Sequence, residues 1–96
     1  MKPSHALETH REDIRRIVAE HRGLNPRVFG SVLNQGDTES SDLDLLIDAA
    51  DGMTLFDMAA IAAAIEDLTQ TRVDVRTPED LSARFRSKVI AEAQPV

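Results

Sequence analysis

Two aspartates at alternate positions open a short segment of this chain that is otherwise apolar. Residues 42–47 read Asp-Leu-Asp-Leu-Leu-Ile. Successive side chains of a strand point to opposite faces, so Asp42 and Asp44 share one face, with Cα atoms roughly 7 Å apart, while the alternate leucines and the isoleucine occupy the other. The pattern therefore predicts a β-strand with one face in a core and one acidic face.

The chemistry of that acidic face points to a bound cation. Two carboxylates so close repel each other and favour a cation between them. Magnesium takes oxygen ligands and is usually held by one or two carboxylates together with substrate phosphates. Upstream, Gly30 and Ser31 precede a polar loop, and such a pair lets the backbone approach phosphate oxygens and adds a hydroxyl donor. We therefore expect a magnesium and triphosphate site at Gly30, Ser31, Asp42 and Asp44.

A third carboxylate is expected on the same face. Residues 72–76 alternate charged and β-branched residues, which predicts a strand whose valines face the helices and whose Asp74 faces the other side. Arg72 and Arg76 share the face of Asp74, where each either pairs with a carboxylate or contacts phosphate. Alternating aspartates also occur on the wet face of an ordinary half-exposed strand. The Gly-Ser pair and Asp74 together favour the metal site over that interpretation.

Apolar periodicity and capping signals predict three helices and three strands. The helices are expected at residues 4–22 with Gly23 as the stop, from the Thr54 and Asp57 capping pair onward, and from Thr77 to about residue 92. The strands are expected at residues 27–29, 42–47 and 72–76. We predict an α+β fold in which helices pack on one face of a small mixed sheet, as a single domain spanning residues 1–96.

Each predicted helix has an apolar stripe at steps of three and four residues, which is expected to be core. The stripe of the first helix is Leu7, Ile14, Ile17 and Val18; that of the second is Leu55, Met58, Ala62, Ile65 and Leu68; that of the third is Leu81, Phe85 and Val89.

Composition excludes several classes of function. A net charge of −6 argues against grip on a long nucleic acid, whose phosphates bind clustered basic residues. The chain has no cysteine, so it has neither disulfides nor thiolate metal ligands, which is consistent with the cytoplasm, where we expect it. No apolar run suits a signal peptide or a membrane span. A chain of 96 residues also leaves little surface for a second substrate, so another protein is expected to present it.

The motifs together resemble a known family. Gly30-Ser31, a loop, Ser-Asp-x-Asp-Leu at residues 41–45 and Asp74 on a later strand resemble the minimal nucleotidyltransferases of the DNA polymerase beta superfamily. Nearly the whole chain resembles the MntA-type antitoxins that are encoded beside HEPN-domain toxins. By position, the resemblance implies a phosphate-binding turn at Gly30 and Ser31, and metal-binding, catalytic carboxylates at Asp42, Asp44 and Asp74.

The resemblance also implies an activity. It is the transfer of AMP from ATP, with two Mg²⁺ ions, to a tyrosine hydroxyl near the active site of a HEPN ribonuclease toxin, in a hetero-oligomer with that partner. Gln35 departs from the family, whose members commonly have glycine there, and the neighbouring Gly36 would shift the turn by one residue. Two alternatives stay open: an antitoxin that neutralises by binding alone, and an enzyme acting on a small molecule such as an aminoglycoside, which would need a further domain.

Overall fold

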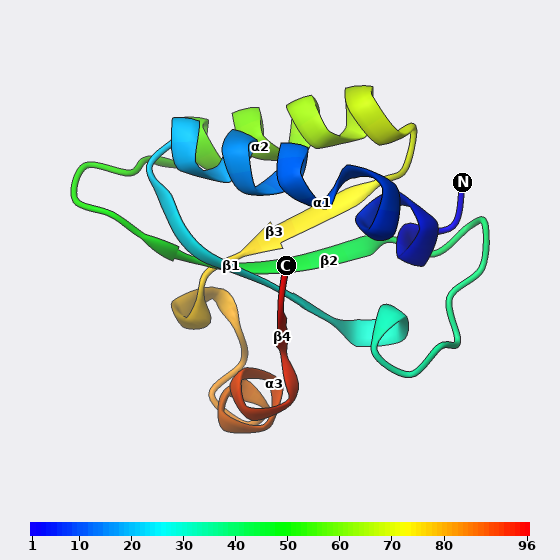
Figure 1. Cartoon of the computed structure of the whole chain (residues 1–96). Coiled ribbons are helices and arrows are strands. Elements are labelled where there is room, and N and C mark those ends of the chain that lie inside the picture. Colours follow the sequence, from blue (N-terminus) through cyan, green and yellow to red (C-terminus); the bar gives the residue numbers. More distant parts are fainter.

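The computed structural model describes residues 1–96 and has two helices on one face of a mixed sheet (Figure 1). Helices α1 (Pro3–Glu20) and α2 (Leu55–Thr69) cover that face, and the short α3 (Arg86–Glu92) lies on the opposite side. The α+β class with a small mixed sheet is confirmed. The last helix differs from the prediction, because it does not join the other two over the same face.

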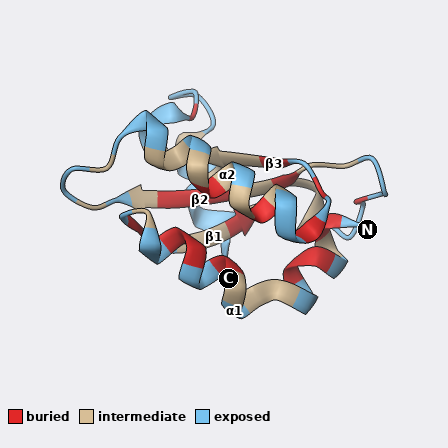
Figure 2. Ribbon diagram, turned by 90° about the horizontal axis from the view of Figure 1, so that it is seen from above, coloured by how far each residue is buried: buried red, intermediate tan, exposed pale blue.

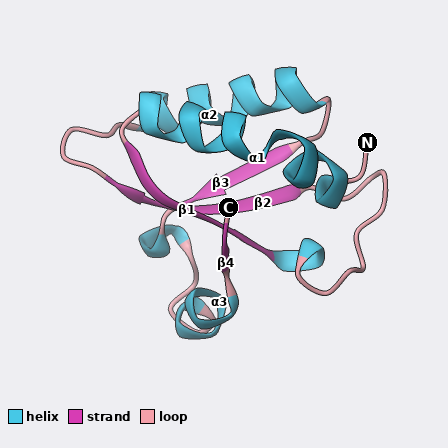
Figure 3. Cartoon of the chain, viewed as in Figure 1, coloured by secondary structure: helices cyan, strands magenta, loops and turns pink.

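The sheet contains four strands in the order β3-β2-β1-β4 (Figure 3). They are β1 (Gly23–Phe29), β2 (Leu43–Ala49), β3 (Val73–Arg76) and β4 (Gln94–Pro95). Strand β2 runs antiparallel to β1 and parallel to β3, and β4 is antiparallel to β1. Strand β2 therefore lies between β1 and β3 and pairs with both.

Strand β1 is longer than predicted, and β4 was not predicted at all. The sequence signal for β1 began at Arg27, but pairing with β2 extends the strand back to Gly23. The Asn25-Pro26 pair is accommodated by a register irregularity between Leu24 and Arg27, where Asn25 takes a φ of 50°. β4 depends on β1, because Val96 N donates to Pro26 O at 3.0 Å across the fold.

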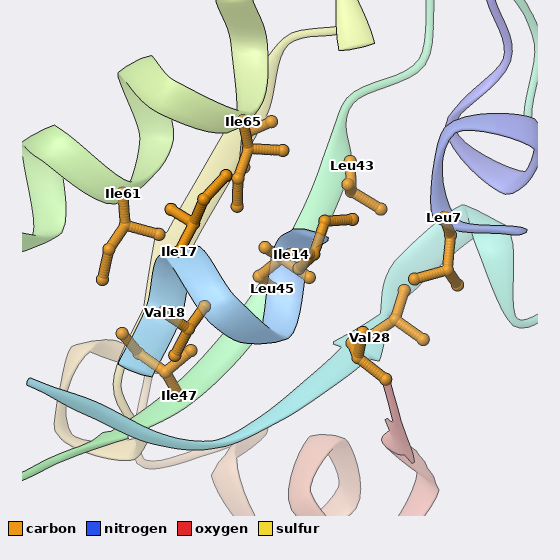
Figure 4. Packing of buried hydrophobic residues seen from close by; sticks show 12 residues of the cluster. Leu7, Ile14, Ile17, Val18, Val28, Leu43, Leu45, Ile47, Ile61 and Ile65 are labelled. Atoms are coloured by element: carbon orange, nitrogen blue, oxygen red, sulfur yellow. The ribbon is translucent and has the colours of Figure 1, made fainter. Parts of the chain in front are cut away.

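Helix α1 packs on the sheet with the predicted stripe. Its four apolar residues are all buried, and they join residues of β2 and α2 in the core (Figure 4). The helix ends at Glu20 rather than at residue 22, with Arg22 in the left-handed region at φ 64°. Gly23 is therefore not the helix stop; it is a buried strand residue pressed against Val18.

Helix α2 begins at the predicted cap but buries a different set of side chains. Thr54 Oγ1 accepts from Asp57 N at 3.2 Å, and Asp57 Oδ2 accepts from Thr54 N at 2.9 Å. Ile61 and Ile65 are fully buried, whereas Leu55 is 79% exposed, so the prediction of Leu55 as core is wrong. Figure 2 shows buried residues along only part of α2, because its first turn extends past the packed core.

The third predicted helix is two separate elements. Thr77 N and Thr77 Oγ1 both donate to Asp80 Oδ2 at 3.0 Å, but this cap opens only a 3-10 turn, Pro78–Asp80. Leu81 is extended, with a ψ of 143°, and buried, and α3 starts at Arg86. Phe85, predicted as core, is 53% exposed. None of the helices combines the length and the apolar character that a bilayer span requires.

The contact between Gly23 and Val18 gives a test of the packing of α1 on β1. A Cβ at Gly23 would lie 2.5 Å from Val18 Cγ1 and 3.0 Å from Val18 O, so Gly23→Ala should destabilise the fold by about 1–3 kcal/mol. Gly36→Ala is the matched control, since no atom lies within 4 Å of its Cβ position. Thermal unfolding should show a lower Tm for the first variant only. Equal Tm values would contradict this packing.

Candidate functional site

Asp44 and Asp74 lie side by side on the sheet face opposite α1 and α2. They are register partners in the parallel pair β2 and β3, so both side chains point to the same face. Asp44 is also the register partner of Phe29, the last residue of β1. Its neighbours Leu43 and Leu45 are fully buried on the other face, as the alternation predicted. The fold thus fixes two carboxylates by the pairing of the strands that carry them.

Gly30 contacts Asp44 directly. Gly30 follows β1 with a φ of +79°, a conformation that glycine adopts without steric cost. A Cβ at this position would overlap Asp44 Oδ2. The glycine is therefore required twice, by the backbone turn and by the close approach of the carboxylate. It brings the partly buried turn Gly30–Val32 against the acidic face.

Two arginines of the β3 segment pair with two of the carboxylates. Arg72 Nε lies 3.0 Å from Asp42 Oδ1, and Arg76 NH2 lies 3.0 Å from Asp74 Oδ2. Each arginine was predicted either to pair with a carboxylate or to contact phosphate, and in the structure both pair with carboxylates. Both pairs are substantially exposed, so each stabilises the chain only weakly. Asp44 has no such partner.

The charge around Asp44 is unbalanced. Burial, followed by the nearby carboxylates of Asp74 and Asp42, raises the pKa of Asp44 to about 6, and Arg76 opposes this only in part. A carboxyl group flanked by two others resists ionisation because like charges lie close. A cation at this face would relieve that repulsion.

The three carboxylates are suited to Mg²⁺ in chemical type, since Mg²⁺ takes oxygen ligands and uses only one or two carboxylates beside phosphates. The observation that favours a cation here is the pairing of Asp44 with Asp74 on one face of adjacent strands, where Asp44 has no ion-pair partner of its own. No group of three or more histidine, cysteine, aspartate or glutamate side chains is arranged so that it could hold a metal ion. Asp42 and Asp74 instead accept hydrogen bonds from Arg72 Nε and Arg76 Nε.

The loop that leads from the glycine to the acidic strand is folded against α1. The 3-10 turn Gly30–Val32 contains Ser31, whose carbonyl accepts from Gly36 N at 3.2 Å. Gln35 itself takes a φ of 54°, and Gly36 is not in the left-handed region. The expected shift of the turn toward Gly36 is therefore wrong: glutamine adopts the conformation that would suit a glycine.

Asp37 anchors this loop and was missed by the sequence reasoning. Its buried carboxylate accepts from Ser4 N at 2.8 Å at the start of α1, and this bond lowers the pKa of Asp37. The bond joins residues 33 positions apart, so no local capping pattern announces it. It ties the loop between Gly30 and Asp42 to the helix layer.

The family follows from comparison with known proteins. The model of the family described as "Polymerase beta, Nucleotidyltransferase" matches residues 12–96. The chain belongs to this family. A solved structure described as a candidate minimal nucleotidyltransferase is 39% identical, with a TM-score of 0.86, and the match covers 97% of this chain and 95% of that one. The prediction of a nucleotidyltransferase of this superfamily is confirmed.

More distant relatives and structural neighbours add context. A Methanocaldococcus jannaschii protein named as a candidate protein adenylyltransferase is 26% identical over 83% of this chain and 86% of its own length. A complex of a tri-AMPylated Shewanella oneidensis HEPN toxin with its MNT antitoxin shares the fold, with a TM-score of 0.67 and 16% identity, over 92% of this chain and 69% of that one. A toxin-antitoxin structure with AMP-PNP has a TM-score of 0.73 at 17% identity, over 88% of this chain and 69% of that one.

The crowding around Asp44 predicts a pH-dependent cost to stability. The folded chain releases this proton near pH 6 and the unfolded chain near 3.8, so stability falls as the pH rises from about 4 through 6. In a chelating buffer at pH 8, Asp44→Asn should be more stable than wild type by about 1 kcal/mol, a value reduced for solvent screening of this half-exposed group. Below pH 4 the advantage should vanish.

Thermal unfolding over a pH series from about 3 to 8 measures this difference. Asp51→Asn is the matched control, because Asp51 lies in the exposed turn before α2, and its curve should follow that of wild type. An Asp44→Asn variant that is less stable than wild type at pH 8 would contradict the electrostatic account.

Proposed function

We propose that this nucleotidyltransferase transfers AMP from ATP, with Mg²⁺, to a tyrosine hydroxyl of a HEPN-domain ribonuclease and thereby acts as its antitoxin. The observation that carries the proposal is the pairing of Asp44 with Asp74 on adjacent strands while Gly30 abuts Asp44. This arrangement sets a phosphate-accessible turn directly beside two carboxylates. The names of the relatives, which include candidate protein adenylyltransferases and an AMPylated HEPN toxin complex, support the choice of acceptor.

The turn and the carboxylates have separate tasks in this reaction. The open backbone at Gly30 and the hydroxyl of Ser31 bind phosphate oxygens. Asp42, Asp44 and Asp74 would hold the cation, which would replace Arg72 and Arg76 beside Asp42 and Asp74. Bound Mg²⁺ supplies charge neutralisation at the phosphates and at the attacking and leaving oxygens.

Transfer itself is a displacement at the α-phosphorus. The acceptor oxygen forms a bond to that phosphorus, the bond to the bridging oxygen breaks, and pyrophosphate leaves with the bonding electrons. Asp74 takes the proton of the attacking hydroxyl, which makes it the general base. The protein contributes mainly positioning and charge, so a small domain suffices when the partner brings the acceptor.

Mass spectrometry of the partner tests the transfer. A HEPN-domain partner protein, incubated with this chain, ATP and Mg²⁺, should gain the mass of one AMP group or a multiple of it, placed on tyrosine. Asp44→Asn and Asp74→Asn should lower the initial rate at least about 100-fold, since they remove a metal ligand and the general base. Asp51→Asn, in an exposed turn, is the control and should retain the rate. A partner that is inhibited yet unmodified would overturn the proposal.

A second candidate is an antitoxin that acts by binding alone, and the conformation of Gln35 is the observation that favours it. A non-glycine residue at φ 54° is disfavoured in the loop that would hold the triphosphate. This alternative predicts that Asp44→Asn still neutralises the ribonuclease when ATP is withheld. Under the transfer proposal, neutralisation requires both ATP and Asp44.

A further inference from the structure

A cleft of about 210 Å³ lies beside the phosphate turn and has no role in the reaction described above. It is formed between the turn that follows β1 and the helix α3. Phe29, at the end of β1, and Leu33, at the end of the turn, line it on one side, and Phe85 and Val89 line it from the α3 segment. The volume is below the 300–1,000 Å³ of sites that enclose a drug-sized ligand, so the cleft suits one part of a larger molecule.

The cleft is continuous with the acidic face. Gly30 lines the cleft and also abuts Asp44, so one glycine separates the apolar walls from the carboxylates. A ligand that reached both would need a flat or apolar end for the cleft and an anionic end for the cation and the turn. A nucleoside triphosphate has both, because its base is flat and its phosphates are anionic.

Phe85 provides an exposed aromatic side chain in the cleft. Phe85 lines the cleft and is 53% exposed, so the rest of the chain leaves much of this residue uncovered. Arg84 Cζ lies 5.4 Å from the ring centroid, a cation–π contact that helps to orient the ring. Stacking of a nucleobase on an aromatic ring is a common and sequence-tolerant interaction.

Lys88 provides the charge. It lines the cleft one helical turn after Phe85 on the same face of α3, and none of the ion pairs of the chain includes it. Arg86, the other cation of α3, is already bonded to the carbonyls of Pro78 and Leu81. Arg72 and Arg76 are paired with carboxylates. Lys88 is thus the cation of this cleft that is available for phosphate.

We propose that this cleft seats the nucleoside end of the triphosphate substrate, with Phe85 stacked on the base and Lys88 bound to phosphate oxygens. The inference rests on the proposed nucleotidyl transfer and adds the residues that bind its donor. It also gives α3 a function on the side of the sheet away from the helix layer. Residues 85–92 then form one wall of the nucleotide site.

Binding of Mg·ATP, measured by calorimetry without any partner, tests the proposal. Phe85→Leu keeps apolar bulk but removes the ring, and should weaken binding about five- to 100-fold, whereas Phe85→Tyr should bind as wild type does. Lys88→Ala should weaken binding by a similar factor. Phe56→Leu and Lys2→Ala are the matched controls, because Phe56 is 87% exposed on α2, Lys2 is exposed before α1, and neither lines the cleft.

Inorganic tripolyphosphate with Mg²⁺ separates the two contacts. It has phosphates but no base, so Lys88→Ala should weaken its binding while Phe85→Leu should leave it unchanged. Loss of tripolyphosphate binding in both variants would indicate a general distortion of α3 and would overturn the assignment of the base to Phe85. Wild-type affinity for Mg·ATP in both variants would overturn the whole cleft assignment and leave the transfer proposal standing. Failure of the wild-type chain to bind Mg·ATP would instead refute the transfer proposal.

Discussion

The partial burial of Asp44 beside two other carboxylates is the constraint on which the rest of the site depends. Asp44 lies in β2, is the register partner of Asp74 in the parallel pair, and contacts Gly30. Burial and the two other carboxylates raise its pKa to about 6, while arginines balance Asp42 and Asp74. Ionisation of Asp44 in this position destabilises the fold, and a bound cation would offset that destabilisation. Strongly shifted pKa values of this kind are common at functional sites.

The helix layer makes this crowding tolerable because it fixes the strands from the other face. Leu43, Leu45 and Ile47 alternate with the acidic positions and are completely buried beneath α1 and α2. Helix α1 also holds the loop between Gly30 and Asp42, since Asp37 accepts a hydrogen bond from Ser4 N in the first turn of α1. The acidic face, the turn and the loop are therefore positioned by one core, and the other side of the sheet stays available for α3 and its cleft.

The parts of the fold that the sequence predicted are those with a local signal. The alternation around Asp42 and Asp44, the valines beside Asp74 and the cap at Thr54 each depend on neighbouring residues, and each appears in the structure. The parts that it missed depend on distant contacts. Strand β4 forms only by pairing with β1. Leu55 is exposed because the first turn of α2 extends past the core. The helical turn that Thr77 caps ends after three residues, because Leu81 is extended and buried. For the site, periodicity placed Asp44 and Asp74 on one face, but the closeness of Gly30 to Asp44 and the arginine pairs required the folded register.

The most direct test of this account is an NMR titration of the Asp44 carboxyl carbon in the free chain, without and with Mg²⁺. The account predicts a pKa of about 6 in chelating buffer and a clear fall when Mg²⁺ is added, because the cation favours the ionised form. An ordinary aspartate pKa in the metal-free chain, or one that Mg²⁺ leaves unchanged, would contradict the claim that these carboxylates form a cation site.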